Sequence, residues 1–197
     1  MTSLDHVGFV APQLAPLRAS MRALGFTLTE PRELRRTDPV TGASVSLQQW
    51  SCHAVFEQGY VELTAVENDD PGHHLAAYLQ RGAGLHILAL GSARIGAEHA
   101  RCAAAGIATT APARATRRIE YGERHGDAAF EWFMFAPAEA PEGLVCYAHN
   151  LTPELVYQRS VQQHANGAVA LEEVVVTVPQ PPAAAARYER LLGLPAL

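Results

Sequence analysis

The chain opens with Leu4-Asp5-His6-Val7-Gly8-Phe9-Val10 and, after a helix-like interval, reaches Ala23-Leu24-Gly25-Phe26. A second copy of this pattern reads Gly84-Leu85-His86-Ile87-Leu88-Ala89-Leu90 and continues to Ala103-Ala104-Ala105-Gly106-Ile107. A third copy reads Leu171-Glu172-Glu173-Val174-Val175-Val176-Thr177-Val178 and continues to Leu191-Leu192-Gly193-Leu194. Each copy has an apolar strand, a break marked by Pro or Gly, a helix rich in Ala, Arg and Leu, and a Gly stop. A pattern repeated in this way predicts a duplicated folding unit.

Three more strands are predicted after each of the first two helices. In the first unit they cover residues 26–29, 44–50 with 54–57, and 60–66, and the polar stretch 30–43 is expected to be a loop. In the second unit they cover residues 117–121, 129–135 and 144–149. Both units therefore have the order β-α-β-β-β, in modules at residues 1–68 and 82–150. The turn-forming cluster Asn68-Asp69-Asp70-Pro71-Gly72 marks the boundary between them.

The last part of the chain predicts a linker helix and an incomplete third module. Thr152-Pro153-Glu154 has the residue types of a helix start, so a helix is expected over 155–164, within a linker at 151–168. Residues 169–197 then supply one strand, 171–178, and one helix. This remnant belongs to a longer protein, packs on the first two units, or packs on another chain, and the sequence leaves these alternatives open.

Composition limits the classes of partner and compartment. The 197 residues are 48% hydrophobic, which is enough for a sizeable core, and carry a formal net charge of −5. An acidic chain without clustered basic residues argues against nucleic acid as a partner, and no apolar run is long enough for a membrane span. Three widely separated cysteines and no signal peptide lead us to expect a cytoplasmic protein. Small molecules, or a second copy in a homodimer, are the expected partners.

Two histidines occupy the same position of the repeated strand. His6 and His86 each follow the first strand residues of their copy, and Glu173 takes that place in the third copy. A single histidine on an apolar strand is usually a hydrogen-bonded core residue, but two at equivalent positions favour metal ligation. Glu62 lies in the apolar strand 60–66, where a carboxylate either faces solvent or needs a metal or a charged partner.

Taken together, these motifs resemble the vicinal oxygen chelate superfamily and, within it, the glyoxalase-like group. The matching pieces are Leu4-Asp5-His6-Val7, Ala23-Leu24-Gly25-Phe26, Gly59-Tyr60-Val61-Glu62-Leu63 and Leu85-His86-Ile87. The resemblance covers residues 3–150 and the start of the third module. It implies an α+β fold in which paired βαβββ modules form a cupped mixed sheet.

The resemblance also implies a divalent metal ion held in the cup. Its ligands would be His6 and Glu62 from the first module, His86 from the second, and a fourth residue at or near His149. Many relatives have a glutamate at this fourth position, and this chain does not. A set of imidazoles and carboxylates suits Fe, Mn, Zn, Ni or Co.

The expected function is that of a metal-dependent glyoxalase-like enzyme. It would be a lyase or isomerase, or a ring-cleaving dioxygenase, acting on a small oxygenated organic substrate that chelates the metal. Glu62 would be its catalytic residue, a general base that leaves the metal when substrate arrives. The alternatives are a non-catalytic protein that binds or sequesters a small molecule in the same fold, and a scaffold whose cup is filled by side chains.

Several other residues have a default structural interpretation. His53 and the pair His73-His74 are expected to be solvated, and Arg117 with Arg118 to form a solvated strand edge that would otherwise steer an anionic substrate. Tyr147 is expected to border the cavity because it shares the strand face of His149.

Overall fold

The computed structural model describes residues 3–38, 40–66 and 71–194 and confirms the predicted α+β fold of paired βαβββ modules. The predicted turn at residues 68–70 lies outside these ranges. The first module consists of β1 (Ser3–Ala11), α1 (Leu14–Ala23), β2 (Arg32–Thr37), β3 (Ser44–Val55) and β4 (Tyr60–Val66). The second consists of β5 (Gly84–Gly91), α3 (Ile95–Ala104), β6 (Ala113–Ile119), β7 (Gly126–Met134) and β8 (Leu144–Asn150). A one-turn helix, α2 (Ala76–Leu79), precedes β5.

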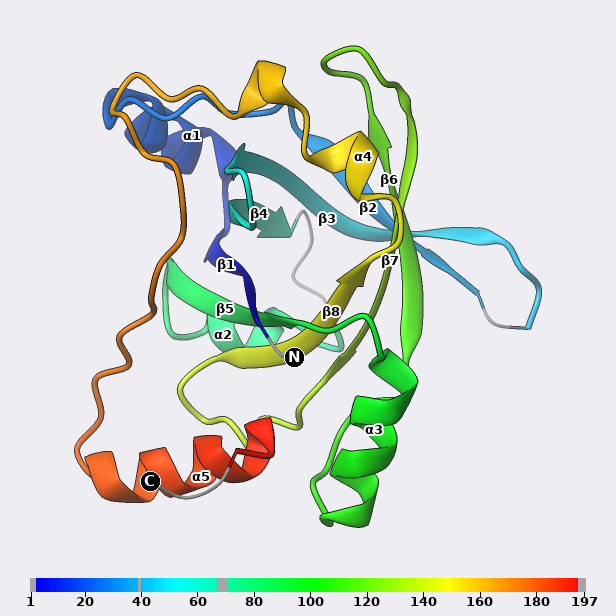
Figure 1. Ribbon diagram of the computed structural model, residues 1–197, viewed down its shortest axis with the longest axis vertical. Coiled ribbons are helices and arrows are strands. Elements are labelled where there is room, and N and C mark those ends of the chain that lie inside the picture. Colours follow the sequence, from blue (N-terminus) through cyan, green and yellow to red (C-terminus); the bar gives the residue numbers. More distant parts are fainter. Residues whose placement is uncertain (1–2, 39, 67–70, 195–197) are drawn as a thin grey trace.

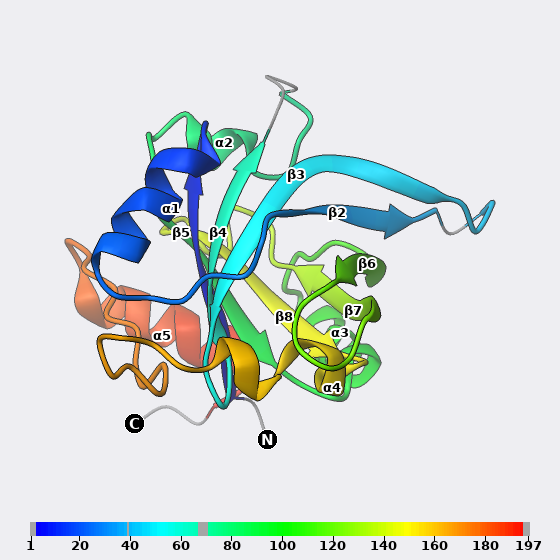
Figure 2. The same cartoon turned by 90° about the horizontal axis from the view of Figure 1, so that it is seen from above.

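The strands of both modules form one closed barrel, in the order β1-β4-β3-β2-β6-β7-β8-β5. Within each module the first and last strands pair in parallel, β1 with β4 and β5 with β8. The modules are joined by antiparallel pairing of β1 with β5 and of β2 with β6. Closure therefore takes place within one chain, and the inner face of the barrel needs no second copy. Beyond the barrel wall, β2 and β3 continue as a projecting hairpin (Figures 1 and 2).

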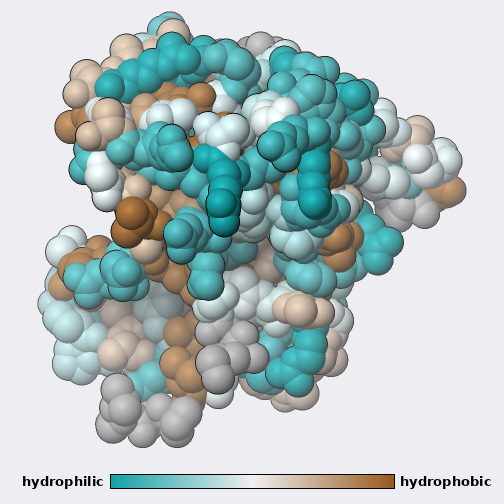
Figure 3. Space-filling model, turned by 45° about the horizontal axis from the view of Figure 1, so that its top comes forward, coloured by the Kyte–Doolittle hydropathy of each residue, from teal (hydrophilic) through white to brown (hydrophobic). Residues whose placement is uncertain are grey.

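Helices cover the outer face of each module. Met21 of α1 packs with Val7, Cys52 and Leu63 on the outside of the first module. On the second module, α3 packs against the outer face of β7 and β8 in a cluster that includes the buried rings of Phe133 and Tyr147. The face in Figure 3 is mostly hydrophilic, with hydrophobic residues in small separate patches. Among the described helices, none is long and apolar enough to span a membrane.

The second strand of the first module differs from the prediction. Residues 26–29 form no strand, and β2 comes instead from the polar stretch that was expected to be a loop. β2 pairs with β3 on one side and with β6 on the other. Its main-chain hydrogen bonds hold it in the barrel, so an apolar pattern is not needed to place it.

The helix expected over residues 155–164 is also absent. The chain there forms one short helix, α4 (Pro153–Val156), and a 3-10 turn at Arg159–Val161. Between them lies Gln158, whose side-chain amide donates hydrogen bonds to the carbonyls of Tyr121, Arg124 and Leu155. These contacts with the loop after β6 stabilise a bend that a continuous helix would not allow.

Of the two elements predicted for the third unit, the helix forms and the strand does not. Its helix is α5 (Pro181–Leu192), which ends at Gly193 in the left-handed conformation. Its expected strand, residues 171–178, has no sheet partner in the described structure. Leu171 and Val174 pack instead on the outer cluster of the first module, while Val175 is exposed. The segment from residue 168 to α5 thus crosses from the α1 side of the molecule to the second module (Figure 1).

Candidate functional site

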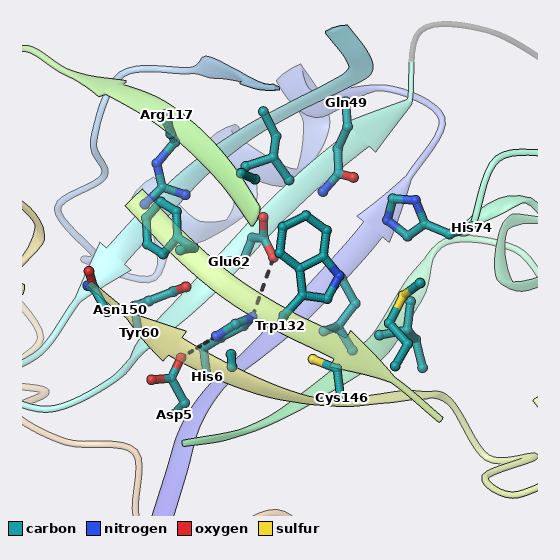
Figure 4. A pocket seen from close by; sticks show the side chains of 17 residues that line it. Asp5, His6, Gln49, Tyr60, Glu62, His74, Arg117, Trp132, Cys146 and Asn150 are labelled. Carbon is teal, nitrogen blue, oxygen red and sulfur yellow. Dashed lines mark hydrogen bonds and ion pairs between the residues drawn. The ribbon is translucent and has the colours of Figure 1, made fainter. Parts of the chain in front are cut away.

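The barrel contains an open cavity of about 100 Å³ with a polar side and an apolar side. The polar side chains come mainly from β1, β4 and β6, and the apolar ones mainly from β5, β7 and β8 (Figure 4). The cavity is lined by Asp5, His6, Leu34, Gln49, Tyr60, Glu62, His74, Ile87, Ala115, Arg117, Phe130, Trp132, Met134, Leu144, Cys146, Ala148 and Asn150.

A β-bulge in β1 brings two neighbouring residues to this cavity. The pairing with β5 skips one residue between Leu4 and His6, so Asp5 is the extra residue of the bulge. Neighbouring strand residues normally face opposite sides of a sheet, and a bulge interrupts this alternation. Asp5 and His6 therefore both line the cavity, and the Oδ1 atom of Asp5 lies 2.5 Å from Nδ1 of His6. An ionised Asp5 accepts the Nδ1 proton, which leaves Nε2 of His6 as the nitrogen directed into the site.

Glu62 lies beside that nitrogen. Its Oε2 atom is 3.8 Å from Nε2 of His6, and its Oε1 atom is 3.9 Å from Nε2 of His53. Glu62 and His53 are directly opposite each other on β4 and β3, which explains why they share a face. The ring of Tyr60 stacks on His6 with centroids 4.5 Å apart and restricts its orientation. His6 and Glu62 are both buried, so the two groups meet in an environment with little water.

His53 and Arg117 form a second buried pair. Nη1 of Arg117 lies 2.7 Å from Nε2 of His53. Burial, the guanidinium charge and His6 hold the pKa of His53 well below its ordinary value, so this imidazole is neutral and Nε2 accepts the hydrogen bond from Arg117. The remaining proton is then on Nδ1, which faces the Thr29 hydroxyl at 3.4 Å. Both residues were expected to be solvated, and both are buried instead.

Three buried polar atoms of the cavity lining have no hydrogen-bond partner among the described residues. They are Nη2 of Arg117, Nδ2 of Asn150 and Oε1 of Gln49. Buried polar atoms are nearly always paired in folded proteins, because leaving them unpaired costs free energy. Three such atoms around one cavity are available to hydrogen-bond a polar ligand or water.

The other two predicted metal ligands lie elsewhere. Nε2 of His86 is 2.8 Å from the carbonyl oxygen of Gly82, and the cavity-lining residue of β5 is Ile87. On β8 the cavity is lined by Ala148 and Asn150, so the intervening His149 is on the opposite face. Tyr147 lies on that outer face too, buried against Phe133, and does not border the cavity as expected. The structure thus brings His6 and Glu62 together and leaves His86 and His149 apart from them.

The repeat of the two modules identifies the cavity residues that take the places expected for His86 and His149. The two modules can be aligned at their helices, since α1 begins at Leu14 and α3 at Ile95. They also align at their parallel strand pairs, where His6 is opposite Tyr60 and Ile87 is opposite Leu144. In this alignment Ile87 is the counterpart of His6. Glu62 lies two residues after Tyr60, and its counterpart two residues after Leu144 is Cys146. The second module therefore offers an isoleucine and a cysteine where the first offers a histidine and a glutamate.

These residues do not fit the expected metal centre. Ile87 has no donor atom, and burial strongly raises the pKa of the Cys146 thiol and so disfavours the thiolate that binds metals. Across the described part of the chain, no group of three or more His, Cys, Asp or Glu side chains is placed to hold a metal ion. Among the described residues that line the cavity, a histidine and a carboxylate lie side by side in the first module, at His6 and Glu62.

The inward position of Arg117 could have been predicted from the sequence pattern of its strand. In β6, Ala115, Arg117 and Ile119 are buried, whereas Arg114 and Arg118 are exposed. The arginine thus takes the place of an apolar residue in the strand alternation, which indicates an inward position. The burial of His53 could not be predicted in this way. The sequence predicts two short strands on either side of it, whereas the structure has one long strand, β3, that includes it.

Comparisons with known proteins agree with this architecture. Residues 4–192 match the family model described as a glyoxalase-like domain. Methylmalonyl-CoA epimerase in complex with methylmalonyl-CoA and NH4+ is similar to the chain at 16% identity and a TM-score of 0.52, over 77% of this chain and 96% of the other. A Streptomyces coelicolor methylmalonyl-CoA epimerase variant in complex with 2-nitronate-propionyl-CoA shows 17% identity and a TM-score of 0.50, over 75% and 96%.

A hypothetical protein from Bacillus halodurans shows 18% identity and a TM-score of 0.51, over 76% of this chain and 94% of the other. A comparison with curated proteins finds no match. At these identities the solved structures support the fold, and the chemistry of the site depends on this chain's own residues.

Proposed function

Because this chain belongs to the glyoxalase-like domain family, we propose that its barrel binds a small oxygenated organic molecule and transfers a proton to or from it. The observation that carries the proposal is the buried arrangement of Asp5, His6 and Glu62 on one side of the cavity. The reaction class is that of an isomerase or lyase, in which a proton next to a carbonyl group is removed and returned.

In the proposed reaction His6 is the general base. Asp5 holds the proton of Nδ1, so the lone pair of Nε2 is available to a substrate in the cavity. When Nε2 takes a proton, the imidazolium is stabilised by Asp5 on one side and by Glu62, 3.8 Å away, on the other. Glu62, which the sequence predicts as the general base, has a different role in this proposal: its carboxylate balances the charge of His6. The apolar wall of Ile87 and Phe130 excludes water from the reacting atoms.

The divalent metal implied by the family resemblance has no complete ligand set in this arrangement. A metal ion would polarise the substrate carbonyl as a Lewis acid if it were bound. Two of its four expected ligands, His6 and Glu62, line the cavity, and their counterparts are Ile87 and Cys146. We therefore assign the proton transfer to the side chains of this chain alone.

Hydrogen–deuterium exchange tests the proposal without knowledge of the natural substrate. Proton NMR in D2O would follow exchange next to the carbonyl in 2-oxobutyrate, acetoin and dihydroxyacetone, in the presence of the purified protein. We expect catalysed exchange of at least one compound. His6→Asn and Asp5→Asn should each reduce it by about 10²–10⁴-fold, the usual contribution of a general base. His86→Asn is the matched control, because this histidine lies outside the cavity.

Exchange that is catalysed equally by the wild-type protein and by His6→Asn would contradict the proposal. Binding of these compounds without catalysed exchange would instead favour the non-catalytic alternative, a protein that sequesters a small molecule. Loss of exchange in His86→Asn, with full activity in Asp5→Asn, would restore the metal site expected from the sequence.

A further inference from the structure

From the unpaired Nη2 atom of Arg117 we infer that the ligand of this cavity is a small organic monocarboxylate, whose carboxylate group binds to Arg117. This inference deepens the proposed function by naming the class of substrate, and it rests on the same cavity. It starts from Arg117, which is 5% exposed and has only one of its two terminal nitrogens paired.

Arg117 forms no direct ion pair with any residue that the structure describes, although Glu62 lies on the other side of His53. Its one hydrogen-bond partner, His53, is neutral, and its guanidinium lies 5.0 Å from the ring centre of Phe130. In the part of the chain that the structure describes, no carboxylate lies within ion-pair distance of Arg117. Glu62 contacts His53 and His6. A buried donor that carries part of a positive charge is costly to leave without a partner, so Nη2 is placed to bind an anionic oxygen of the ligand.

The rest of the cavity restricts this counter-ion to a monoanion on a short carbon skeleton. Asp5 and Glu62 already line the cavity, and a dianion such as phosphate would face both of them with a single cation in return. Nδ2 of Asn150, whose Oδ1 accepts a hydrogen bond from the main chain of Thr152, is a second unpaired donor for an anionic oxygen. The remaining wall is apolar and suits a hydrocarbon body next to the carboxylate group.

This arrangement also fits a cavity in which the second half of the expected metal site is absent among the described residues. In the first module the polar pair His6 and Glu62 remains, and in the second their counterparts Ile87 and Cys146 carry no charge. Arg117, from the second module, supplies the positive charge that a metal ion would otherwise bring to substrate oxygens. The planar guanidinium suits a carboxylate in particular, because it presents its donors in a fixed fork.

The test compares acids with their uncharged amides by calorimetric titration in chloride-free buffer. Isobutyrate and isobutyramide, and 2-oxobutyrate with its amide, are the probes, and inorganic phosphate is the competing anion. We expect each acid to bind the wild-type protein about 100-fold more tightly than its amide. Arg117→Gln should lose this preference, and Arg118→Gln should keep it, because Arg118 is the next residue of the same strand and is exposed.

A second measurement keeps the inference testable if Arg117→Gln folds poorly. Isobutyrate should raise the melting temperature of the wild-type protein more than isobutyramide does, and Arg117→Met should remove this difference. Equal binding of acid and amide, a preference for phosphate over both acids, or an equal effect of acid and amide on the melting temperature of the wild-type protein would overturn the inference. These outcomes are separate from the proposed function, since His6→Asn should abolish exchange and still bind the acids.

Discussion

His74 is the cavity residue whose protonation has the clearest consequence for stability. It lies in the loop between β4 and α2, and its ring stacks on His73 with centroids 4.4 Å apart. Burial first, and the neighbouring His73 second, lower the pKa of His74 to about 4 from an ordinary value of 6.5. In the unfolded chain this histidine takes up a proton below pH 6.5, whereas the folded protein takes it up only near pH 4.

The free energy of unfolding should therefore decrease as the pH falls from about 6.5 to about 4. The share due to His74 is about 2–3 kcal/mol, from the difference between its folded and unfolded pKa values. Urea denaturation of the wild-type protein and of His74→Asn at pH 7, 6, 5 and 4 measures it. We expect the wild-type curve to fall more steeply than that of the variant. Parallel curves would show that His74 is not held neutral in the folded protein.

At the scale of the strand, Gly59 determines how closely β4 approaches the bulge in β1. Its φ angle is +76°, and a Cβ atom at this position would lie 2.4 Å from the carbonyl oxygen of Asp5. No side chain fits there without moving the main chain of Asp5, which holds His6 in place. Gly59→Ala should lower the free energy of unfolding by about 3 kcal/mol or more, and should also reduce the activity that depends on His6.

Gly42 provides the control for Gly59. Its φ angle is +70°, and nothing lies within 4 Å of a Cβ atom built on it. Gly42→Ala therefore has only the conformational cost of a left-handed alanine, about 1 kcal/mol. Thermal denaturation of both variants measures the difference, and equal destabilisation would mean that the contact with Asp5 is relieved by a small shift of the strand.

The strands and helices of the barrel were largely predictable, but the face of each strand was not. A displacement by one residue moves a side chain from the inside of a sheet to the outside. His6 and His86 match when the two strand motifs are compared by residue type alone. The glycines that end the helices, Gly25 and Gly106, lie 81 positions apart, and this spacing assigns Ile87 as the counterpart of His6. The bulges in β1 and β5, which fix these positions, leave no mark in the pattern of hydrophobicity.

Restoring both counterparts should create the metal site that the duplication implies. In the double variant Ile87→His and Cys146→Glu, four donor residues would face the cavity, two from each module. After loading with Zn²⁺ or Mn²⁺ and gel filtration, we expect about one metal ion per chain in the double variant and much less in the wild-type protein. Elemental analysis measures both.

The control is His86→Ala with His149→Ala, which removes the two histidines that do not line the cavity. This variant should have the same metal content as the wild-type protein. A stoichiometric metal in the wild-type protein that disappears from this control would refute the assignment of Ile87 and Cys146 as the relevant positions.

At the scale of the whole molecule, the regions that differ from prediction are those held by distant contacts. β2 depends on β6 of the other module, the bend at Gln158 depends on the loop after β6, and the extended segment before α5 depends on the outer face of the first module. None of these partners is near in sequence, so local patterns do not reveal them. The pair of βαβββ modules was predictable because each module carries its own strand order, whereas the closure of both modules into one barrel within the chain was not.

The last helix, α5, has a structural role at the scale of the whole molecule. Leu191 of α5 is fully buried in the outer cluster of the second module, and Arg101 of α3 donates a hydrogen bond to its carbonyl oxygen at 2.7 Å. With Leu171 and Val174 packed on the first module, residues 168–192 contact both halves of the barrel from outside. Removing one anchor should therefore destabilise the whole domain, and α5 should still unfold together with the barrel.

Leu191→Ala should lower the free energy of unfolding by about 2–4 kcal/mol, because it deletes a buried side chain and leaves a cavity beneath α5. Leu194→Ala is the matched control: the same substitution three residues later, at a side chain that is 56% exposed, should change stability by less than about 0.5 kcal/mol. Denaturation followed by both circular dichroism and tryptophan fluorescence would show whether the two signals still change together. If Leu191→Ala released α5 at low denaturant while the fluorescence transition stayed at its wild-type midpoint, the helix would be an independent appendage and not part of the barrel's folding unit.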